Sequence, residues 1–531
     1  MTTEGTRRRL RFIAVALALM LAAILTQQVR YYAADPNGQK DCSPLAPPLP
    51  AAERAVTAAD SSDPQSPDWA QRGGGINDVS CLNPTPVYGV VQVTGVEDVR
   101  QALAFARANR LKVSIAGARH SQGGHAFAPD AVVLDMRRFN QMSVDEASRV
   151  LTVQSGATWH DIQNRLHPRF AVKAMQSTDV FTVGGSISVN AHGMDHRAGS
   201  VGGTVRTMRV MLPDGTIHAI SRTEEPELFR LVVGGYGLFG IILDADLEIT
   251  ENAVYRSGRE ILDYQSFPAF FNDRVLGNES YRILYGHLST APQSFLREMI
   301  LYTYREVPVH PDSIPPLGEV SGVGLRRLVF NLSKFGGLAM RLKWWAEKHV
   351  EPRLENCPLG DADGCLVSRN DPMHDSVPYL MNSLAGETDI LHEYFVPRDQ
   401  LVPFVDGLRR IAIADEANLL NASVRVVHRE DNFLNYAPTD MFAIVLYLNQ
   451  TTDAEGAARM ATLTRDLIEL TIGLGGRFFL PYQLHYTGDQ LRRSYPEIGE
   501  FFRAKDVYDP EHILINTFYT KYAPQVVAGR P

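Results

Sequence analysis

The residues with the clearest capacity for chemistry form a run of small and basic side chains early in the chain. Glycines have no Cβ, so the backbone can turn tightly and its N–H groups can form a concavity that suits a phosphate or pyrophosphate. An arginine in the run adds positive charge, and a histidine offers a nucleophilic ring nitrogen. The alternative is a plain glycine-rich loop with an exposed histidine. The run consists of Ala116, Gly117, Ala118, Arg119, His120, Ser121, Gln122 and Gly123.

A second glycine turn, Thr182-Val-Gly-Gly185, lies further along the chain. Its glycines would let backbone amides approach the same anionic group. His192 and His196 follow it four residues apart, which is a metal-ligand spacing when it occurs on a helix. Gly193 disfavours a helix here and no glutamate follows His192. We therefore expect no metal site in this chain.

A third turn, Gly235-Tyr-Gly-Leu-Phe-Gly240, has the G-x-G-x-x-G spacing of a nicotinamide-dinucleotide site. Such a site requires a helix after the turn. Residues 241–250 instead alternate apolar and polar side chains, which is the period of a strand. The pattern therefore argues against NAD.

The three turns, in this order, make the chain resemble the flavin-linked oxidases of the vanillyl-alcohol oxidase / p-cresol methylhydroxylase superfamily. Their marks in this sequence are Gly117-Ala-Arg-His-Ser121, Thr182-Val-Gly-Gly185 and Gly237-Leu-Phe-Gly-Ile241. The resemblance covers about residues 77–250 and the C-terminal tail. It implies an α+β fold in which two subdomains hold an extended FAD and a cap of antiparallel sheet and helices covers the isoalloxazine ring.

The resemblance also implies which residues contact the cofactor. In the family, the histidine at the position of His120 often bonds covalently to the 8α-methyl carbon of the flavin, so we expect FAD attached through His120, with His125 as the rival. The glycine-rich run of residues 116–123 would bind FAD as well. The other cofactor-binding residues that we expect are Ser177, Thr178, Asp179, Thr182, Val183, Gly184, Gly185, Ser188, His192, Gly193, Gly240, Ile241 and Asn516.

The candidates for catalysis are four polar residues outside the cofactor turns. Glu393, Arg425 and His428 lie on or beside expected cap strands, and His485 lies in the tail, which ends in the Tyr-Asp-Pro and Leu-x-Asn pattern of many relatives. A proton-accepting base must reach the substrate proton. The alternative for each cap residue is that its side chain lies on the solvent-exposed face of a strand and has no catalytic role.

Local patterns predict the elements that hold these residues. We expect strands at 87–93, 113–116, 132–136 and 150–156, a helix opened by a capping box at Thr94 and Glu97, and a second helix at 159–166. Cap strands are expected at 391–397, 423–427 and 442–447. The expected divisions are an export signal or anchor (1–34), a tether (35–76), the FAD-binding domain (77–252), a cap (253–475) and a C-terminal segment that folds back on the FAD domain (476–531).

The composition narrows the class of partner and compartment. The chain has 531 residues and a formal net charge of -8, which leaves no basic footprint for nucleic acid. Its four cysteines, Cys42, Cys81, Cys357 and Cys365, fall into two pairs close in sequence. An even count fits disulfides in an oxidising compartment, with unrelated cytosolic thiols as the alternative.

The N-terminus has the layout of an export signal. Basic residues 7–11 precede an apolar run at 12–25, with a loose likeness to a twin-arginine signal. No clear cleavage site follows, so we favour an uncleaved membrane anchor over a removed signal peptide. Positive residues before the run place the catalytic body outside the cytoplasm, in the periplasm or beyond.

The sequence thus predicts an exported FAD-dependent oxidoreductase of CH–OH substrates: a polyol, sugar, lactone or sugar-lipid alcohol, with oxygen or a quinone as electron acceptor. One alternative is cytokinin-dehydrogenase-like oxidation of CH–NH, favoured by Leu480-Pro-Tyr and His485-Tyr486. Another is a membrane-tethered flavin electron carrier without turnover.

Overall fold

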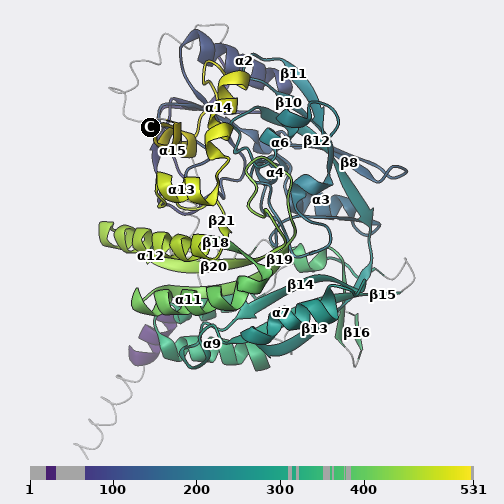
Figure 1. Ribbon diagram of the computed structural model, residues 1–531, viewed down its shortest axis with the longest axis vertical. Coiled ribbons are helices and arrows are strands. Elements are labelled where there is room, and N and C mark those ends of the chain that lie inside the picture. The colour runs from purple at the N-terminus through teal and green to yellow at the C-terminus, as the bar shows by residue number, and fades with distance from the viewer. Residues whose placement is uncertain are drawn as a thin grey trace, which may run out of the picture.

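The computed structural model describes residues 20–30, 66–308, 314–318, 322–350, 359–361, 364–375, 377, 384 and 386–527 (Figure 1). Most of the predicted anchor and tether therefore lies outside the described residues. Residues 20–30 form a helix, but no helix in the described part of the chain is long and apolar enough to cross a membrane. The expected transmembrane segment stays a prediction. Cys81 and Cys365 are each disulfide-bonded, whereas Cys42 and Cys357 fall outside the described residues.

A four-stranded sheet in the order β1-β4-β6-β5 carries the first glycine-rich turn. β6 pairs in parallel with both β4 and β5. Parallel strands are usually covered on both faces, and the residues of β4 and β6 are accordingly apolar and buried for the most part. α2 (Val96–Ala108) covers this sheet, and Asp98 accepts hydrogen bonds from the Thr94 and Gly95 amides at its start. Asp98 therefore caps the helix in place of the expected Glu97. The strands are β1 (Trp69–Arg72), β4 (Gly89–Gln92), β5 (Val113–Ala116) and β6 (Val132–Asp135).

A six-stranded antiparallel sheet carries the second and third turns. Its order is β11-β10-β12-β8-β7, and β9 pairs with the far end of β12. β12 (Ile241–Glu251) is the strand that the alternation after Gly240 predicts. The other strands are β7 (Met142–Asp145), β8 (Val150–Gln154), β9 (Phe170–Val172), β10 (Val205–Met211) and β11 (Ile217–Ser221). The helices beside this sheet are α3 (Trp159–Leu166), α4 (Val183–Ser188), α5 (Val201–Thr204) and α6 (Pro226–Val232).

The third large sheet has nine strands in the order β16-β17-β13-β15-β14-β19-β20-β18-β21. α11 and α12 pack against each other and against β18, on one side of the sheet (Figure 1). The strands are β13 (Val254–Asp263), β14 (Tyr281–Leu288), β15 (Glu298–Val307), β16 (Leu359–Asp361), β17 (Gly364–Ser368), β18 (Glu387–Pro397), β19 (Asn418–Val427), β20 (Met441–Thr451) and β21 (Arg477–Phe478). Its helices are α7 (Phe267–Phe270), α8 (Val323–Ser333), α9 (Gly337–His349), α11 (Leu401–Ala414) and α12 (Ala454–Gly473).

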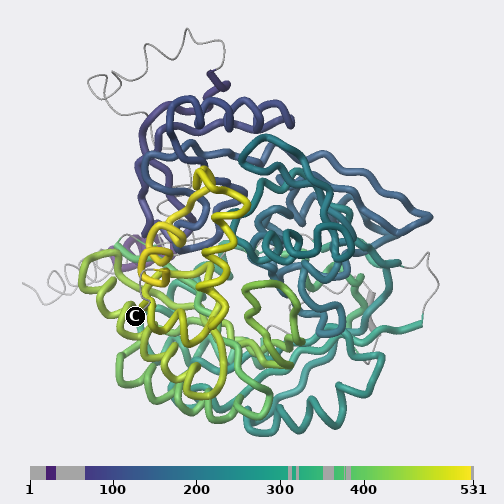
Figure 2. The backbone as a smooth tube through the Cα atoms, turned by 45° about the horizontal axis from the view of Figure 1, so that its top comes forward, coloured from purple at the N-terminus to yellow at the C-terminus, as the bar shows by residue number. Residues whose placement is uncertain are grey.

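The C-terminal helices return to the first sheet. Figure 2 shows this yellow segment between the purple N-terminal part and the green cap. Leu514 forms a parallel β-bridge with Val113, at the strand that leads into the first glycine-rich turn. The buried Lys505–Asp509 ion pair, at 2.5 Å, organises the chain just before that bridge. The helices are α13 (Gly488–Ser494), α14 (Ile498–Tyr508) and α15 (Thr517–Val527). This mixture of sheets and helices confirms the predicted α+β class.

Candidate functional site

A cavity of about 740 Å³ lies between the glycine turns and the nine-stranded sheet. Cofactor and ligand pockets are typically about 300–1,000 Å³. The structure brings most of the predicted cofactor-binding residues together here, although they come from four separate stretches of sequence. Those that line the cavity are Gly117, Ala118, Arg119, His120, Ser121, Gln122, Ser177, Thr178, Thr182, Gly184, Gly185, Ser188, His192 and Gly240.

The first two glycine turns touch each other in this wall. A Cβ on Gly117 would lie 2.1 Å from Thr182 Oγ1, and one on Gly184 would lie 2.7 Å from Ser155 Cβ. Both contacts are too short for a side chain, which explains why glycine stands at each position. The buried hydroxyls of Ser155 and Thr178 line the cavity and have no hydrogen-bond partner among the described residues. The exposed backbone of these turns suits the phosphates of FAD, and the unpaired hydroxyls could bind its phosphates or its ribityl chain.

His120 lies at the end of the first turn and lines the cavity. Its ring meets the ring of Phe181 edge to face, with 5.1 Å between the centroids. Arg119 before it has a left-handed backbone, with a φ of 56°, as expected where successive amides turn toward one concavity. His125 also lines the cavity but is buried, stacked 5.6 Å from Phe518, and burial lowers its pKa to about 3.

The opposite wall comes from one face of the nine-stranded sheet. His287, Ser423, Val445 and Glu393 form a row across β14, β19, β20 and β18, because each is the register partner of the next. All four line the cavity. Since side chains two residues apart share a face, Arg425 joins Ser423 there. The sheet therefore presents the predicted Glu393 and Arg425 to the cavity.

Four polar side chains meet where the two walls join. His192 Nε2 lies 2.6 Å from Glu393 Oε1, and both residues are buried. Tyr482 also hydrogen-bonds Glu393, and burial raises the pKa of the Tyr482 hydroxyl well above its usual value. The Arg425 guanidinium donates to Ser177 Oγ at 2.9 Å, and burial lowers its pKa, although the Glu393 carboxylate opposes that shift. A carboxylate between an imidazole, a phenol and a guanidinium is suited to moving a proton.

Two predicted catalytic residues lie away from this lining. His428 follows the end of β19, where its Nδ1 lies 3.2 Å from Asp440 Oδ1. His485 lies between β21 and α13, and burial lowers its pKa to about 4. Its backbone carbonyl accepts from Arg465 at 2.8 Å. Neither histidine lines the cavity, so the geometry does not support a direct catalytic contact for either.

The remaining predicted cofactor residues also lie outside the lining. Asn516 donates from its side chain to the Tyr236 carbonyl at 2.8 Å, and Tyr236 itself lines the cavity. Asp179 is buried and pairs with two histidines. The complete set outside the lining is Ala116, Gly123, Asp179, Val183, Gly193, Ile241 and Asn516.

Sequence reasoning missed several lining residues. Tyr482 belongs to the Leu480-Pro-Tyr stretch, whose likeness to cytokinin dehydrogenases does not by itself place the tyrosine in the cavity. Lys343 and Glu347, an ion pair at 3.1 Å on α9, lie in a stretch that carries no cofactor motif. No local pattern distinguishes an inward-facing lysine from an outward-facing one. Tyr285 and Tyr302, whose rings stack at 4.8 Å, sit on strands that no motif marked.

Comparison with known proteins now adds to this geometry. Residues 87–221 match the family described as "FAD binding domain". An uncharacterized oxidoreductase from the fasciation locus of Rhodococcoides fascians is 32% identical over 240 residues, which cover 44% of this chain and 54% of that protein. Decaprenylphosphoryl-beta-D-ribose oxidase of Mycolicibacterium smegmatis is 33% identical over 31% of this chain and 37% of its own length. Cytokinin dehydrogenase 4 of Arabidopsis thaliana is 23% identical over 77% of this chain and 80% of its own length.

These matches confirm the resemblance drawn from the three glycine turns. Residues 87–221 carry a FAD binding domain, and the chain is similar to proteins named as oxidoreductases, oxidases and dehydrogenases. It aligns with only about half of the first of these relatives and about a third of the second. Substrate and detailed activity are therefore matters for proposal.

Proposed function

We propose that this protein oxidises a CH–OH group, with His192 as the base that takes the hydroxyl proton. The observation that carries this proposal is the buried His192–Glu393 pair at the cavity. Bound FAD would supply the acceptor for the hydride that leaves the same carbon, so that the alcohol becomes a carbonyl.

Glu393 selects the tautomer of the His192 ring through the contact at Nε2. An ionised carboxylate can only accept, so it holds the proton on Nε2 and leaves the Nδ1 lone pair available. Nδ1 is buried and has no partner among the described residues. Arg425 of the cap wall donates to Ser177 Oγ of the FAD wall at 2.9 Å and places positive charge where an alkoxide would develop. Tyr482 keeps the Glu393 carboxylate in place through its hydroxyl.

The cap wall supports a polyhydroxylated substrate, such as a polyol, sugar, lactone or sugar-lipid alcohol. It presents Asn421 and Ser423 from β19, and the Lys343–Glu347 pair and His287 close the same region. Glu347 Oε2 is buried without a hydrogen-bond partner in the described structure, as is His287 Nε2. Buried polar atoms of this kind are normally satisfied by a ligand or by water.

Oxidation of a CH–NH group is the second candidate. It is supported by the alignment with cytokinin dehydrogenase 4, which spans most of both chains. Steady-state turnover of a panel of polyols, sugar lactones and isoprenoid-adenine amines separates the two candidates. Selective turnover of hydroxylated substrates supports the first proposal, and selective turnover of amines overturns it.

We also propose that FAD is bound covalently through His120, which lines the cavity beside Phe181. Acid-denatured protein on a gel should keep flavin fluorescence in its band. His120→Ala should lose this fluorescence, whereas His125→Ala, which replaces the rival histidine, should retain it. Flavin that washes out of the unmodified protein contradicts the covalent bond but not FAD binding.

We further propose a membrane-anchored location outside the cytoplasm, with oxygen or a quinone as acceptor. The basic and apolar N-terminal residues support an anchor. The disulfide-bonded Cys81 and Cys365 support an oxidising compartment. Several apolar side chains on α8 and α9 are strongly exposed, including Leu338 at 73% and Trp345 at 55%, which suits contact with lipid. Carbonate-resistant membrane fractionation, with protease digestion from the outer face, tests both parts.

A further inference from the structure

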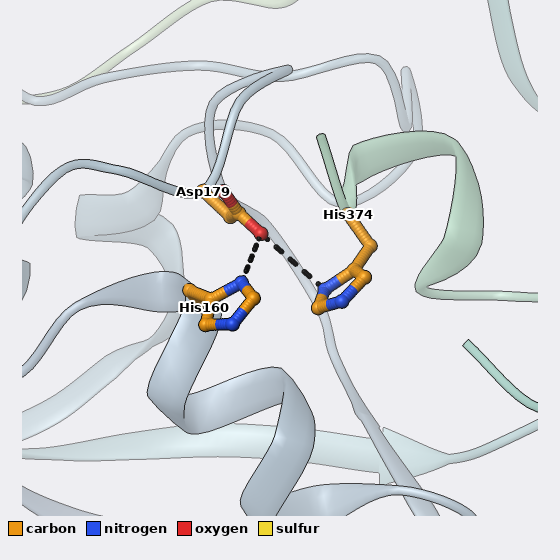
Figure 3. A group of neighbouring side chains, drawn as sticks. All are labelled: His160, Asp179 and His374. Carbon is orange, nitrogen blue, oxygen red and sulfur yellow. Dashed lines mark hydrogen bonds and ion pairs between the residues drawn. The ribbon is translucent and has the colours of Figure 1, made fainter. Parts of the chain in front are cut away.

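Three side chains from separate segments of the chain converge (Figure 3), and residues next to two of them line the cavity. His160 comes from α3, Asp179 from the segment before α4, and His374 from the segment after the 3-10 turn Asp371–Met373. Asp179 Oδ2 lies 2.8 Å from His160 Nδ1 and 3.3 Å from His374 Nδ1. The two imidazole rings stack, with 4.8 Å between their centroids and 14° between their planes.

The spacing of these atoms suits a transition-metal ion. One ligand atom from each of the three residues lies within 4.8 Å of the other two. Tetrahedral Zn²⁺ with bonds of about 2.0–2.1 Å to nitrogen and oxygen places its ligands roughly 3.3 Å apart. Small side-chain shifts therefore bring the three atoms onto one ion. Two imidazoles and one carboxylate form a common zinc ligand set.

A fourth candidate ligand stands next to the three. Gln163, one helical turn after His160 on α3, places its Oε1 2.8 Å from His374 Nδ1. Its amide nitrogen donates to the Asn370 carbonyl at 3.3 Å, which directs the oxygen toward the cluster. Hydrogen bonds of this kind orient the ligands of metal sites.

The charge of the cluster also points to a cation. Asp179 is 1% exposed, and its Oδ1 has no hydrogen-bond partner among the described residues. Its ion-pair partners in the described part of the chain are the two histidines, with no lysine or arginine among them. Burying a carboxylate without a lysine or arginine partner is costly. A divalent cation supplies that charge and occupies the second oxygen.

We propose that His160, Asp179 and His374 bind a divalent metal ion of the zinc type, with Gln163 as the fourth ligand. This departs from the expectation of no metal, which was drawn from His192 and His196 alone. The site is structural, since none of its ligands lines the cavity.

The position of the proposed metal site suggests that the ion links the two walls of the cavity. The neighbours of Asp179, Ser177 and Thr178, line the cavity from the FAD side, whereas Pro372 and Asp375, beside His374, line it from the cap side. A metal bound by both segments holds the two walls together at the cofactor. This purpose does not depend on which substrate is oxidised.

Metal content of the full-length, FAD-loaded protein tests the proposal. Protein purified without chelator should carry about one zinc per chain by elemental analysis. After chelation, zinc titration by calorimetry should restore one site and raise the melting temperature. Cobalt substitution should give the strong visible absorption of a tetrahedral site. Asp179→Asn and His374→Gln should each weaken zinc binding at least 100-fold.

The matched control is His218→Gln, which replaces a half-exposed histidine that also pairs with a carboxylate, Glu225, at 2.8 Å. It should bind zinc as the unmodified protein does. If micromolar zinc neither binds the chelated protein nor changes its melting temperature, the cluster is only a hydrogen-bonded network and the proposal is wrong. Binding that persists equally in Asp179→Asn also overturns it. Variants that fail to fold leave the titration of the unmodified protein as the deciding measurement.

Discussion

The two walls of the cavity are built in different ways. The FAD-side wall consists of short glycine turns whose backbone atoms form much of the surface. Gly117 and Gly184 stand where no Cβ fits. The cap wall consists of side chains on strands far apart in sequence, brought into one row from His287 to Glu393. A cofactor of constant shape suits a wall of fixed backbone, whereas a wall of side chains can be changed for another substrate without altering the fold.

Replacing Glu393 tests the chemistry of the cap wall and should have the largest effect. A glutamine amide can donate as well as accept, so Glu393→Gln no longer fixes one tautomer of His192, and kcat should fall about 100- to 10,000-fold, as for loss of general-base catalysis. FAD content should not change, because the carboxylate belongs to the cap. Stopped-flow flavin reduction measures the loss.

The control for this variant is Glu387→Gln on the same strand. Glu387 pairs with Lys334, which keeps Asp389 as a second partner at 2.8 Å. Its kcat should stay within a few fold of the unmodified protein. Equal losses in both variants would show that Glu393 acts only through the stability of β18.

Replacing a glycine tests the FAD wall. Gly184→Ala places a methyl group 2.7 Å from Ser155 Cβ, so the turn must move at a cost of about 1–3 kcal/mol. FAD occupancy after gel filtration should drop, with the cap unaffected. Gly203→Ala is the control, since its nearest contact would be an ordinary 3.7 Å. Full FAD occupancy in Gly184→Ala would contradict a backbone-built wall.

The pH dependence of unfolding tests the contribution of the buried His125 in the FAD wall to stability. Burial lowers the pKa of His125 to about 3, so this histidine stays neutral when folded but takes a proton below pH 6.5 when unfolded. Its contribution to stability is complete above pH 6.5 and falls toward pH 3, by about 1.4 kcal/mol per pH unit. His125→Leu should therefore unfold at lower pH than the unmodified protein.

Circular dichroism between pH 3 and 7 measures the unfolding midpoint. Burial raises the pKa of Asp78 to about 6, which opposes this trend between roughly pH 6 and 4 equally in both proteins. His218→Leu, at a half-exposed position, is the control and should keep the original midpoint. An unchanged midpoint in His125→Leu would show that another group sets acid stability.

The smallest expected effect concerns substrate contact alone. Ser423 lies in the row that faces the cavity, and one lost hydrogen bond is worth about 0.5–1.5 kcal/mol. Ser423→Ala should raise KM a few fold for a hydroxylated substrate and leave kcat and FAD content nearly unchanged. Unchanged KM for every substrate tested places the substrate elsewhere in the cavity.

Much of the FAD wall could be predicted from the sequence because its features are local. Fourteen of the predicted cofactor residues line the cavity, and the strand after Gly240 is where alternation placed it. The cap was only partly predictable. Glu393 and Arg425 were expected as polar groups on cap strands, but the sequence did not say which face they occupy; His428 falls just beyond its strand, and His485 does not line the cavity.

The sequence by itself determined the class of fold and the cofactor, because tight turns need glycine at particular positions and those turns are continuous in the chain. Only the tertiary structure decided which side chains meet. The His192–Glu393 pair joins residues 201 positions apart, and the His160–Asp179–His374 cluster joins α3 to the cap. Such contacts depend on strand register and sheet packing, which arise from the whole buried core and leave no mark in any one stretch.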